Sequence, residues 1–115
     1  MTSQYDDLTN AALLALAHRA LSRYPAALQG KLSLLCRSEN ATFLLEAAGK
    51  RYALRLHRGN YHQRADILSE LRWLDALRET GIVVPQALAD REGQTVQDLR
   101  LADGSLRHAV LFDWI

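Results

Sequence analysis

The stretch that decides the fold is Lys50-Arg51-Tyr52-Ala53-Leu54-Arg55-Leu56-His57-Arg58. Three large apolar residues, Tyr52, Leu54 and Leu56, alternate in it with charged or small residues. This period of two is typical of a strand that packs one face against a core and turns the other face to polar surroundings. We therefore expect a central strand that carries Arg55 on the face opposite its large apolar side chains.

A carboxylate downstream is the natural partner of Arg55. Residues 64–80 have the three- and four-residue spacing of an amphipathic helix, and its apolar stripe carries Glu70 among Ile67, Leu71, Leu74 and Leu77. A carboxylate on a buried stripe needs a cation or a hydrogen-bond donor, and a guanidinium can bind it bidentately or end-on while another edge faces an anion. A structural ion pair that locks helix to sheet, or a Glu70 that reaches solvent, remain alternatives.

The segments around this strand predict the rest of the fold. A helix capped by Thr9 or Asp7 and stopped by Pro25 precedes the sheet. Strands are predicted at 32–37, 43–47, 51–57, 95–101 and 106–114, with another extended piece at 86–90 and tight turns at 48–49 and 102–105. The sum is a mostly antiparallel sheet of five strands, with one long helix between the third and fourth and an extra N-terminal helix. With helices on one face of the sheet, this is the α+β class.

The composition excludes several functional classes. With 115 residues, 49% hydrophobic and 23% charged, the chain forms one folded domain but is small for a complete enzyme with two substrates. Its 14 basic residues are matched by 13 acidic ones, which gives no support for a nucleic-acid partner. The single cysteine excludes an internal disulfide and fits a reducing cytoplasm.

The ends of the chain carry two further expectations. The start is polar and acidic, and no stretch approaches the roughly 18 apolar residues of a membrane span. We therefore expect a cytoplasmic protein that makes no membrane contact. The end, Asp113-Trp114-Ile115, follows an apolar run directly, whereas termini are usually solvated. We expect the full gene product to continue beyond it.

Several side chains have simpler predictions. We expect His18 on the surface, Trp73 in the core beside the helix stripe, and Cys36 as a small core residue on the inward side of its strand. The basic cluster of Arg55, His57, Arg58, His62 and Arg64 either faces phosphates or, as most such charges do, forms mostly solvated surface, which is the expectation here.

Four segments in this order carry a family resemblance. They are CRSENATFLL at 36–45, RYALRLHR at 51–58, SELRWL at 69–74 and GIVVP at 81–85. Together they resemble the amino-terminal lobe of the aminoglycoside phosphotransferase family, which also takes in choline kinase-like and homoserine kinase-like enzymes with a protein-kinase-like fold. The resemblance implies that residues 30–115 form an ATP-binding lobe, that residues 1–29 are an N-terminal helical extension, and that the carboxy-terminal lobe is absent from this chain.

The resemblance implies roles for residues at the phosphates of ATP. Arg55 would take the place of the third-strand lysine that holds the α- and β-phosphates, and Glu70 would orient it. The phosphate-covering loop between the first two strands would consist of Ser38, Glu39, Asn40, Ala41 and Thr42. This loop departs from the family pattern because it contains no glycine, which makes close backbone approach to phosphate less assured.

The same resemblance places the adenine site at the end of the chain. Leu111 or Phe112 would line the adenine pocket, and the hinge that reads the adenine edge would begin at Asp113 and Trp114. No histidine begins a His-x-Asp catalytic loop, and no Asp-x-Asp metal-binding segment follows. We therefore predict no catalytic residue in this chain, and we expect the magnesium ligands on the missing lobe.

These expectations favour a lobe of an enzyme that transfers the γ-phosphoryl group of ATP, with magnesium, to a hydroxyl of a small molecule, or of a protein serine or threonine. The 115-residue piece alone is not expected to be active. An alternative is a non-catalytic protein-interaction or self-association module that uses its exposed interlobe face. An unrelated α+β domain with a coincidental match is a third interpretation.

Overall fold

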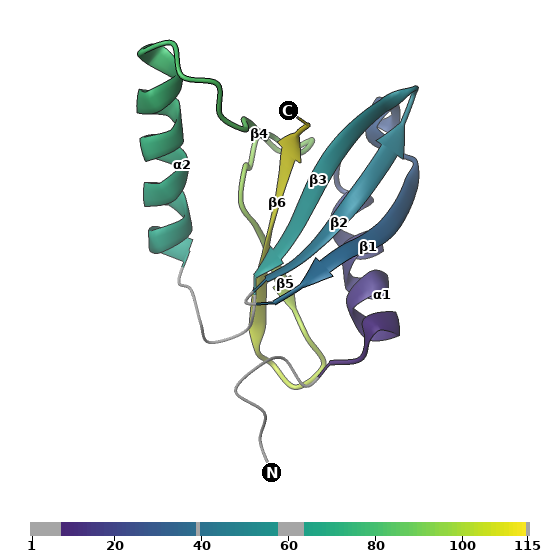
Figure 1. Cartoon of the computed structure of the whole chain (residues 1–115). Coiled ribbons are helices and arrows are strands. Elements are labelled where there is room, and N and C mark those ends of the chain that lie inside the picture. Colours follow the sequence, from purple (N-terminus) through teal and green to yellow (C-terminus); the bar gives the residue numbers. More distant parts are fainter. Residues whose placement is uncertain (1–7, 39, 58–63, 115) are drawn as a thin grey trace.

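The computed structural model describes residues 8–38, 40–57 and 64–114, which form one antiparallel sheet and two α-helices (Figure 1). The elements in chain order are α1 (Asn10–Leu21), a 3₁₀ turn η1 (Ala26–Leu28), β1 (Lys31–Arg37), β2 (Asn40–Ala47), β3 (Lys50–His57), α2 (Arg64–Glu79), β4 (Ala87–Leu88), β5 (Gln97–Arg100) and β6 (Leu106–Asp113). The strand order is β1-β2-β3-β6-β4, and β5 also pairs with β6. The predicted α+β class is confirmed, with six strands in place of five because the short β4 joins the sheet.

Local chemistry explains where the elements begin and end. The Thr9 hydroxyl caps α1 by accepting a hydrogen bond from the backbone of Ala12. Ala48 and Gly49 both have positive φ, at 52° and 76°, as a two-residue hairpin turn between β2 and β3 requires. Gly81, at φ 92°, ends α2 in a Schellman motif, because its N–H bonds the carbonyl of Arg78 and the next N–H bonds that of Leu77.

Each helix covers its own face of the sheet. On the α1 face, the main core combines buried residues of the helix with those of the strands, among them Leu13, Leu16, Phe43, Leu45, Leu54, Leu56 and Leu111. On the α2 face, Ile67 and Leu71 pack against Val110 and Phe112 in a smaller cluster. The expectation of helices on one face is therefore wrong. The reason is β6, whose run 109–112 is buried on both faces and needs cover on both.

A β-bulge in β1 overturns the prediction for Cys36. Strict alternation places Cys36 on the same face as Leu34, toward the main core. The register shifts between Leu34 and Cys36, so that Leu34 lies opposite Phe43 while Cys36 lies opposite Thr42. The extra residue turns the cysteine to the α2 face, where it is exposed.

The predictions for Trp73 and for the first loop are also wrong. Trp73 is 62% exposed, because it lies two residues, about 200°, from the buried Leu71 around the helix. Asn40, Ala41 and Thr42 are not loop residues, because they pair in β2 with His57, Leu56 and Arg55.

His18 is exposed, as expected. Neither helix in the described ranges is long and apolar enough to span a bilayer.

The exposed position of Cys36 gives a direct test of the bulge. We expect a water-soluble maleimide to modify Cys36 in the folded protein at a rate close to that in denaturant, because its thiol is already exposed. Mass spectrometry of the peptide that carries the label measures this rate. Strong protection in the folded protein would show instead that the alternation continues to the end of β1.

Candidate functional site

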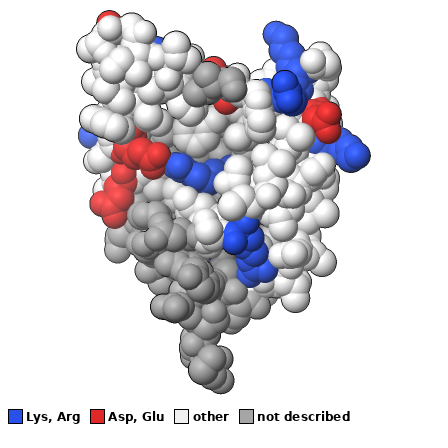
Figure 2. Space-filling view, in the orientation of Figure 1, with Lys and Arg blue, Asp and Glu red and all other residues white. Residues whose placement is uncertain are grey.

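The α2 face of the sheet carries an open pocket of about 460 Å³. Its walls come from β2, β3, α2 and the end of β6, and its lining consists of Thr42, Ala53, Arg55, Glu70, Leu74, Pro85, Phe112, Asp113 and Trp114. Most of this lining is apolar, and the charged groups are few. Figure 2 shows this face, with basic and acidic atoms side by side near its middle. An apolar pocket with a few converging polar groups is the usual form of a small-molecule site.

The charged centre of the pocket is the Arg55 and Glu70 pair. The two terminal nitrogens of Arg55 donate to the two carboxylate oxygens of Glu70, at 3.1 and 2.9 Å. The side chains are 20% and 41% exposed, so both reach the open side of the pocket. The predicted meeting of these residues is confirmed. This bidentate contact joins β3 to α2. It restricts the distance between the guanidinium and the carboxylate and the orientation of the guanidinium plane.

Two further groups hold the Arg55 side chain. The Phe112 ring lies under the guanidinium, with its centroid 5.0 Å from the central carbon. In addition, the Nε–H of Arg55 donates to Nε2 of His57 at 3.1 Å. His57 was predicted to be mostly solvated, but it is only 2% exposed. The signal for this contact was present in the sequence, because residues two apart in a strand share a face.

The guanidinium is only partly satisfied by these contacts. It carries five N–H groups, and the contacts to Glu70 and His57 account for three of them. A cation that is fixed in place and retains N–H donors at an open pocket can bind an anion such as a phosphate.

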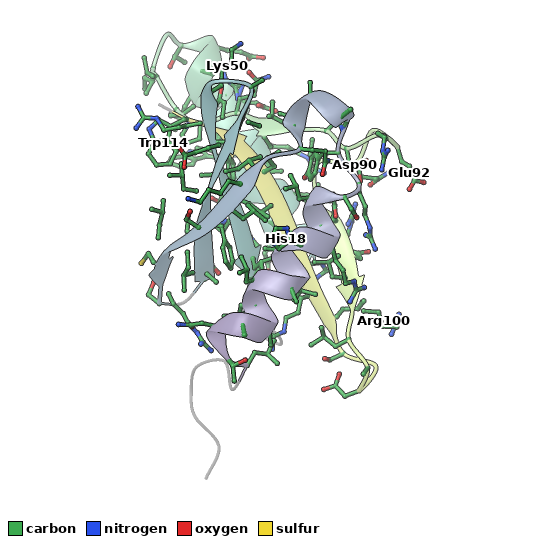
Figure 3. All side chains as sticks on the ribbon, turned by 90° about the vertical axis from the view of Figure 1, so that its right-hand side faces the viewer. His18, Lys50, Asp90, Glu92, Arg100 and Trp114 are labelled. Atoms are coloured by element: carbon green, nitrogen blue, oxygen red, sulfur yellow. The ribbon has the colours of Figure 1, made fainter. Side chains whose placement is uncertain are left out.

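The end of β6 forms the mouth of the pocket. Trp114 is 40% exposed, and the guanidinium of Arg51 lies 5.4 Å from its ring centroid. Figure 3 shows Trp114 near the end of the sheet where β3 begins at Lys50. Asp113 has a structural task, because its carboxylate accepts from the backbone N–H of Gln86 at 2.8 Å and its own N–H donates to the carbonyl of that residue.

The structure brings most of the predicted site residues together. Thr42, Arg55, Glu70, Phe112, Asp113 and Trp114 all line the pocket. Leu111 does not, because it belongs to the main core on the α1 face, so Phe112 is the one of this pair that faces the pocket. Ser38 lies in the turn after β1 and Asn40 at the start of β2, and neither lines the pocket. Glu39, Arg58 and His62 lie outside the described residues.

Sequence reasoning missed three lining residues. Ala53 faces the pocket from β3, and Leu74 and Pro85 close it from the side of α2. Ala53 has the same strand parity as Arg55, which was a usable signal. Leu74 lies one helical turn after Glu70, which was also a usable signal. Pro85 had none, because its place depends on how the chain after α2 returns to the sheet.

Arg64, the remaining member of the basic cluster among the described residues, holds the fold. Arg64 donates to the carbonyl of Val96 and to the carboxylate of Asp98, both at 2.8 Å. His108 also lies 2.9 Å from that carboxylate. In the described parts of the chain, no three side chains of His, Cys, Asp or Glu gather as metal ligands would.

Comparisons with known proteins agree with this geometry. The model of the phosphotransferase enzyme family matches residues 36–115. A solved structure of the microcompartment-associated aminopropanol kinase is 40% identical, with a TM-score of 0.80, and the match covers 89% of this chain and 31% of that one. An amicoumacin kinase in complex with AMP-PNP and Ca²⁺ is 19% identical, with a TM-score of 0.72, and covers 96% of this chain and 31% of its own length.

At 19% identity, the second likeness concerns the fold alone. The chain spans about a third of the length of both solved structures, 31% in each case. No curated protein sequence matches the chain.

The open position of the ion pair gives a stability prediction. Glu70→Gln should lower the free energy of unfolding by less than about 1 kcal/mol, because a pair this exposed is screened by water. The control is Leu54→Ala at a fully buried position of the same sheet, for which we expect about 2 to 5 kcal/mol. Urea unfolding measures both. A loss with Glu70→Gln as large as that of the control would mean that the pair is mainly a structural lock.

Proposed function

This chain belongs to the phosphotransferase enzyme family, and from that premise we propose that it is the ATP-binding lobe of a longer, two-lobed enzyme. In this proposal residues 30–115 form the lobe, residues 1–29 extend it, and a second lobe supplies the catalytic base. The whole enzyme transfers the γ-phosphoryl group of ATP to a hydroxyl of a small molecule. The observation that carries the proposal is the Arg55 cation, held by Glu70 at an open pocket with N–H donors to spare.

Each part of the pocket has a task in this proposal. Arg55 binds the α- and β-phosphates and neutralises their charge, which is the main requirement of phosphoryl transfer. Phe112 and Ala53 lie opposite each other on neighbouring strands and offer an apolar bed for the adenine ring. The N–H of Asp113 is occupied by Gln86. Adenine recognition therefore uses other backbone groups of the hinge, together with the ring of Trp114.

Thr42 completes the phosphate end of the pocket in this proposal. Among the described residues of the predicted loop, only Thr42 lines the pocket, and it lies directly opposite Arg55 on the neighbouring strand. Its hydroxyl can donate to the phosphate that Arg55 binds. Ser38 and Asn40 act only if the chain after β1 closes over the nucleotide, because they lie beyond the pocket lining.

Magnesium belongs to the second lobe in this proposal. The described part of this chain brings together no set of three metal-ligating side chains. Its residues therefore bind and orient the nucleotide, and we assign no step through the metal to them.

The aminopropanol kinase supports one class of phosphoryl acceptor. The chain is 40% identical to the corresponding part of the aminopropanol kinase. We therefore propose a small amino alcohol as the first acceptor to test, ahead of a protein serine or threonine. The acceptor-binding residues lie on the second lobe in this proposal.

Substitution of Arg55 tests the function directly. In the full-length protein we expect Arg55→Ala to weaken ATP binding about 10- to 100-fold, because a charge-assisted contact to phosphate contributes about 1.5 to 3 kcal/mol. Adenosine, which has no phosphate, should bind as before. Isothermal titration calorimetry with the two ligands measures both affinities.

The matched control is Arg72→Ala, which removes the same charge from an exposed position of α2 outside the pocket. It should leave both affinities unchanged. Unchanged ATP affinity in Arg55→Ala would refute the phosphate-binding role of this residue.

The alternative of a self-association module is supported by exposed apolar side chains at the end of α2. Ile82 is 50% and Val83 is 76% exposed, and Trp73 within α2 is also exposed. In our proposal these side chains contact the second lobe, whereas in the alternative they contact another copy of the chain.

Light scattering of the full-length protein separates the two functions. We expect the double variant Ile82→Ser and Val83→Ser to leave its molar mass unchanged, because the second lobe and not another copy covers these residues. A lower molar mass for the variant than for the wild type would favour the self-association module.

A further inference from the structure

His57 is placed to control the direction of the Arg55 guanidinium. The two residues lie on the same face of β3, and Nε–H of Arg55 donates to Nε2 of His57 at 3.1 Å. His57 is 2% exposed, so this imidazole is enclosed by protein and not by water. A buried acceptor restricts where the donor that it binds can point.

The contact with Arg55 determines the tautomer of the His57 imidazole. Arginine stays protonated in proteins, so its Nε can only donate. Nε2 of His57 must therefore present a lone pair, which makes the ring neutral with its proton on Nδ1.

His57 and Glu70 contact Arg55 from different elements of the fold. Glu70 reaches Arg55 from α2, a helix whose described residues are buried against the sheet only at Ile67 and Leu71. His57 reaches Arg55 from within β3 itself. Its hold on the guanidinium therefore does not depend on the position of α2.

The three contacts also determine which N–H groups remain. Glu70 uses one N–H on each terminal nitrogen of Arg55, and His57 uses the one on Nε. These contacts with described residues leave two N–H groups, one on each terminal nitrogen. With Nε occupied, the edge formed by Nε and a terminal nitrogen cannot bind a phosphate as a bidentate fork.

We propose that His57 is a positioning residue for the phosphate contact of Arg55. It fixes the guanidinium plane against rotation about the side chain, so that the remaining terminal N–H groups bind phosphate oxygens one at a time. The inference rests on the proposed function, because it acts through Arg55. Its test therefore has to show whether an error lies in the positioning role of His57 or in the phosphate-binding role of Arg55.

Two variants of His57 separate positioning from packing. His57→Gln keeps an acceptor near the place of Nε2, and His57→Leu fills similar space without one. In the full-length protein we expect His57→Leu to weaken ATP binding about tenfold, a loss of roughly 1.4 kcal/mol. Adenosine affinity should not change, and His57→Gln should restore ATP affinity to within about twofold of the wild type. Equal losses for ATP and adenosine, or no recovery with glutamine, would overturn the proposal.

A double-mutant cycle with Arg55→Ala separates the positioning role of His57 from the phosphate-binding role of Arg55. In that background His57→Leu should cost no further ATP affinity, because the group it positions is absent. If Arg55→Ala weakens ATP binding but His57→Leu does not, the positioning role is wrong and the phosphate site stands. If Arg55→Ala itself has no effect, the phosphate site is wrong.

A control histidine and a measurement without mutation complete the test. His108→Leu changes a histidine on the same face of the sheet that contacts Asp98, and it should not alter the preference for ATP over adenosine. In the wild type, nitrogen NMR should show the His57 proton on Nδ1 and a coupling from Arg55 Nε–H to His57 Nε2. A proton on Nε2 would overturn the proposal even if the variants of His57 fail to fold.

Discussion

A fixed positive charge on the less covered face of the sheet is the constraint on which the pocket depends. Arg55 lies in mid-strand, where its side chain cannot retreat to bulk water without leaving the sheet, and Glu70 meets it with two hydrogen bonds. Because a half-buried cation needs a partner, Glu70 of α2 faces Arg55 of β3 across the pocket. The space between them, floored by Phe112 and Ala53, is the candidate nucleotide site.

The sheet divides stability and function between its two faces. On the α1 face, large apolar side chains from the helix and from five strands make the main core, and their burial supplies most of the stabilisation. On the α2 face, the apolar cluster is small, and α2 is buried at only Ile67 and Leu71 among its described residues. A rigid face therefore supports a more open one, on which a ligand can contact strands and helix at once.

Predictions from the sequence succeeded where one residue or one short period decides the outcome. The hairpin turn at Ala48 and Gly49, the cap at Gly81 and the pair of Arg55 with Glu70 all follow from local rules and are all present. The predictions failed where an irregularity or a neighbour intervened. The bulge in β1 turned Cys36 outward, and pairing with β3 drew Asn40 to Thr42 into β2.

The sequence by itself determined the elements, their order, the α+β class and the charge pair, because period-two and helical patterns encode which side chains share a face. Only the tertiary structure decided that the helices cover opposite faces, that Phe112 and not Leu111 faces the pocket, and that His57 holds Arg55. These features depend on the pairing of β6 with β3 and on the placement of α2. Both bring together residues that are far apart in the chain. A local sequence pattern carries no information about the distance between such residues in the folded protein.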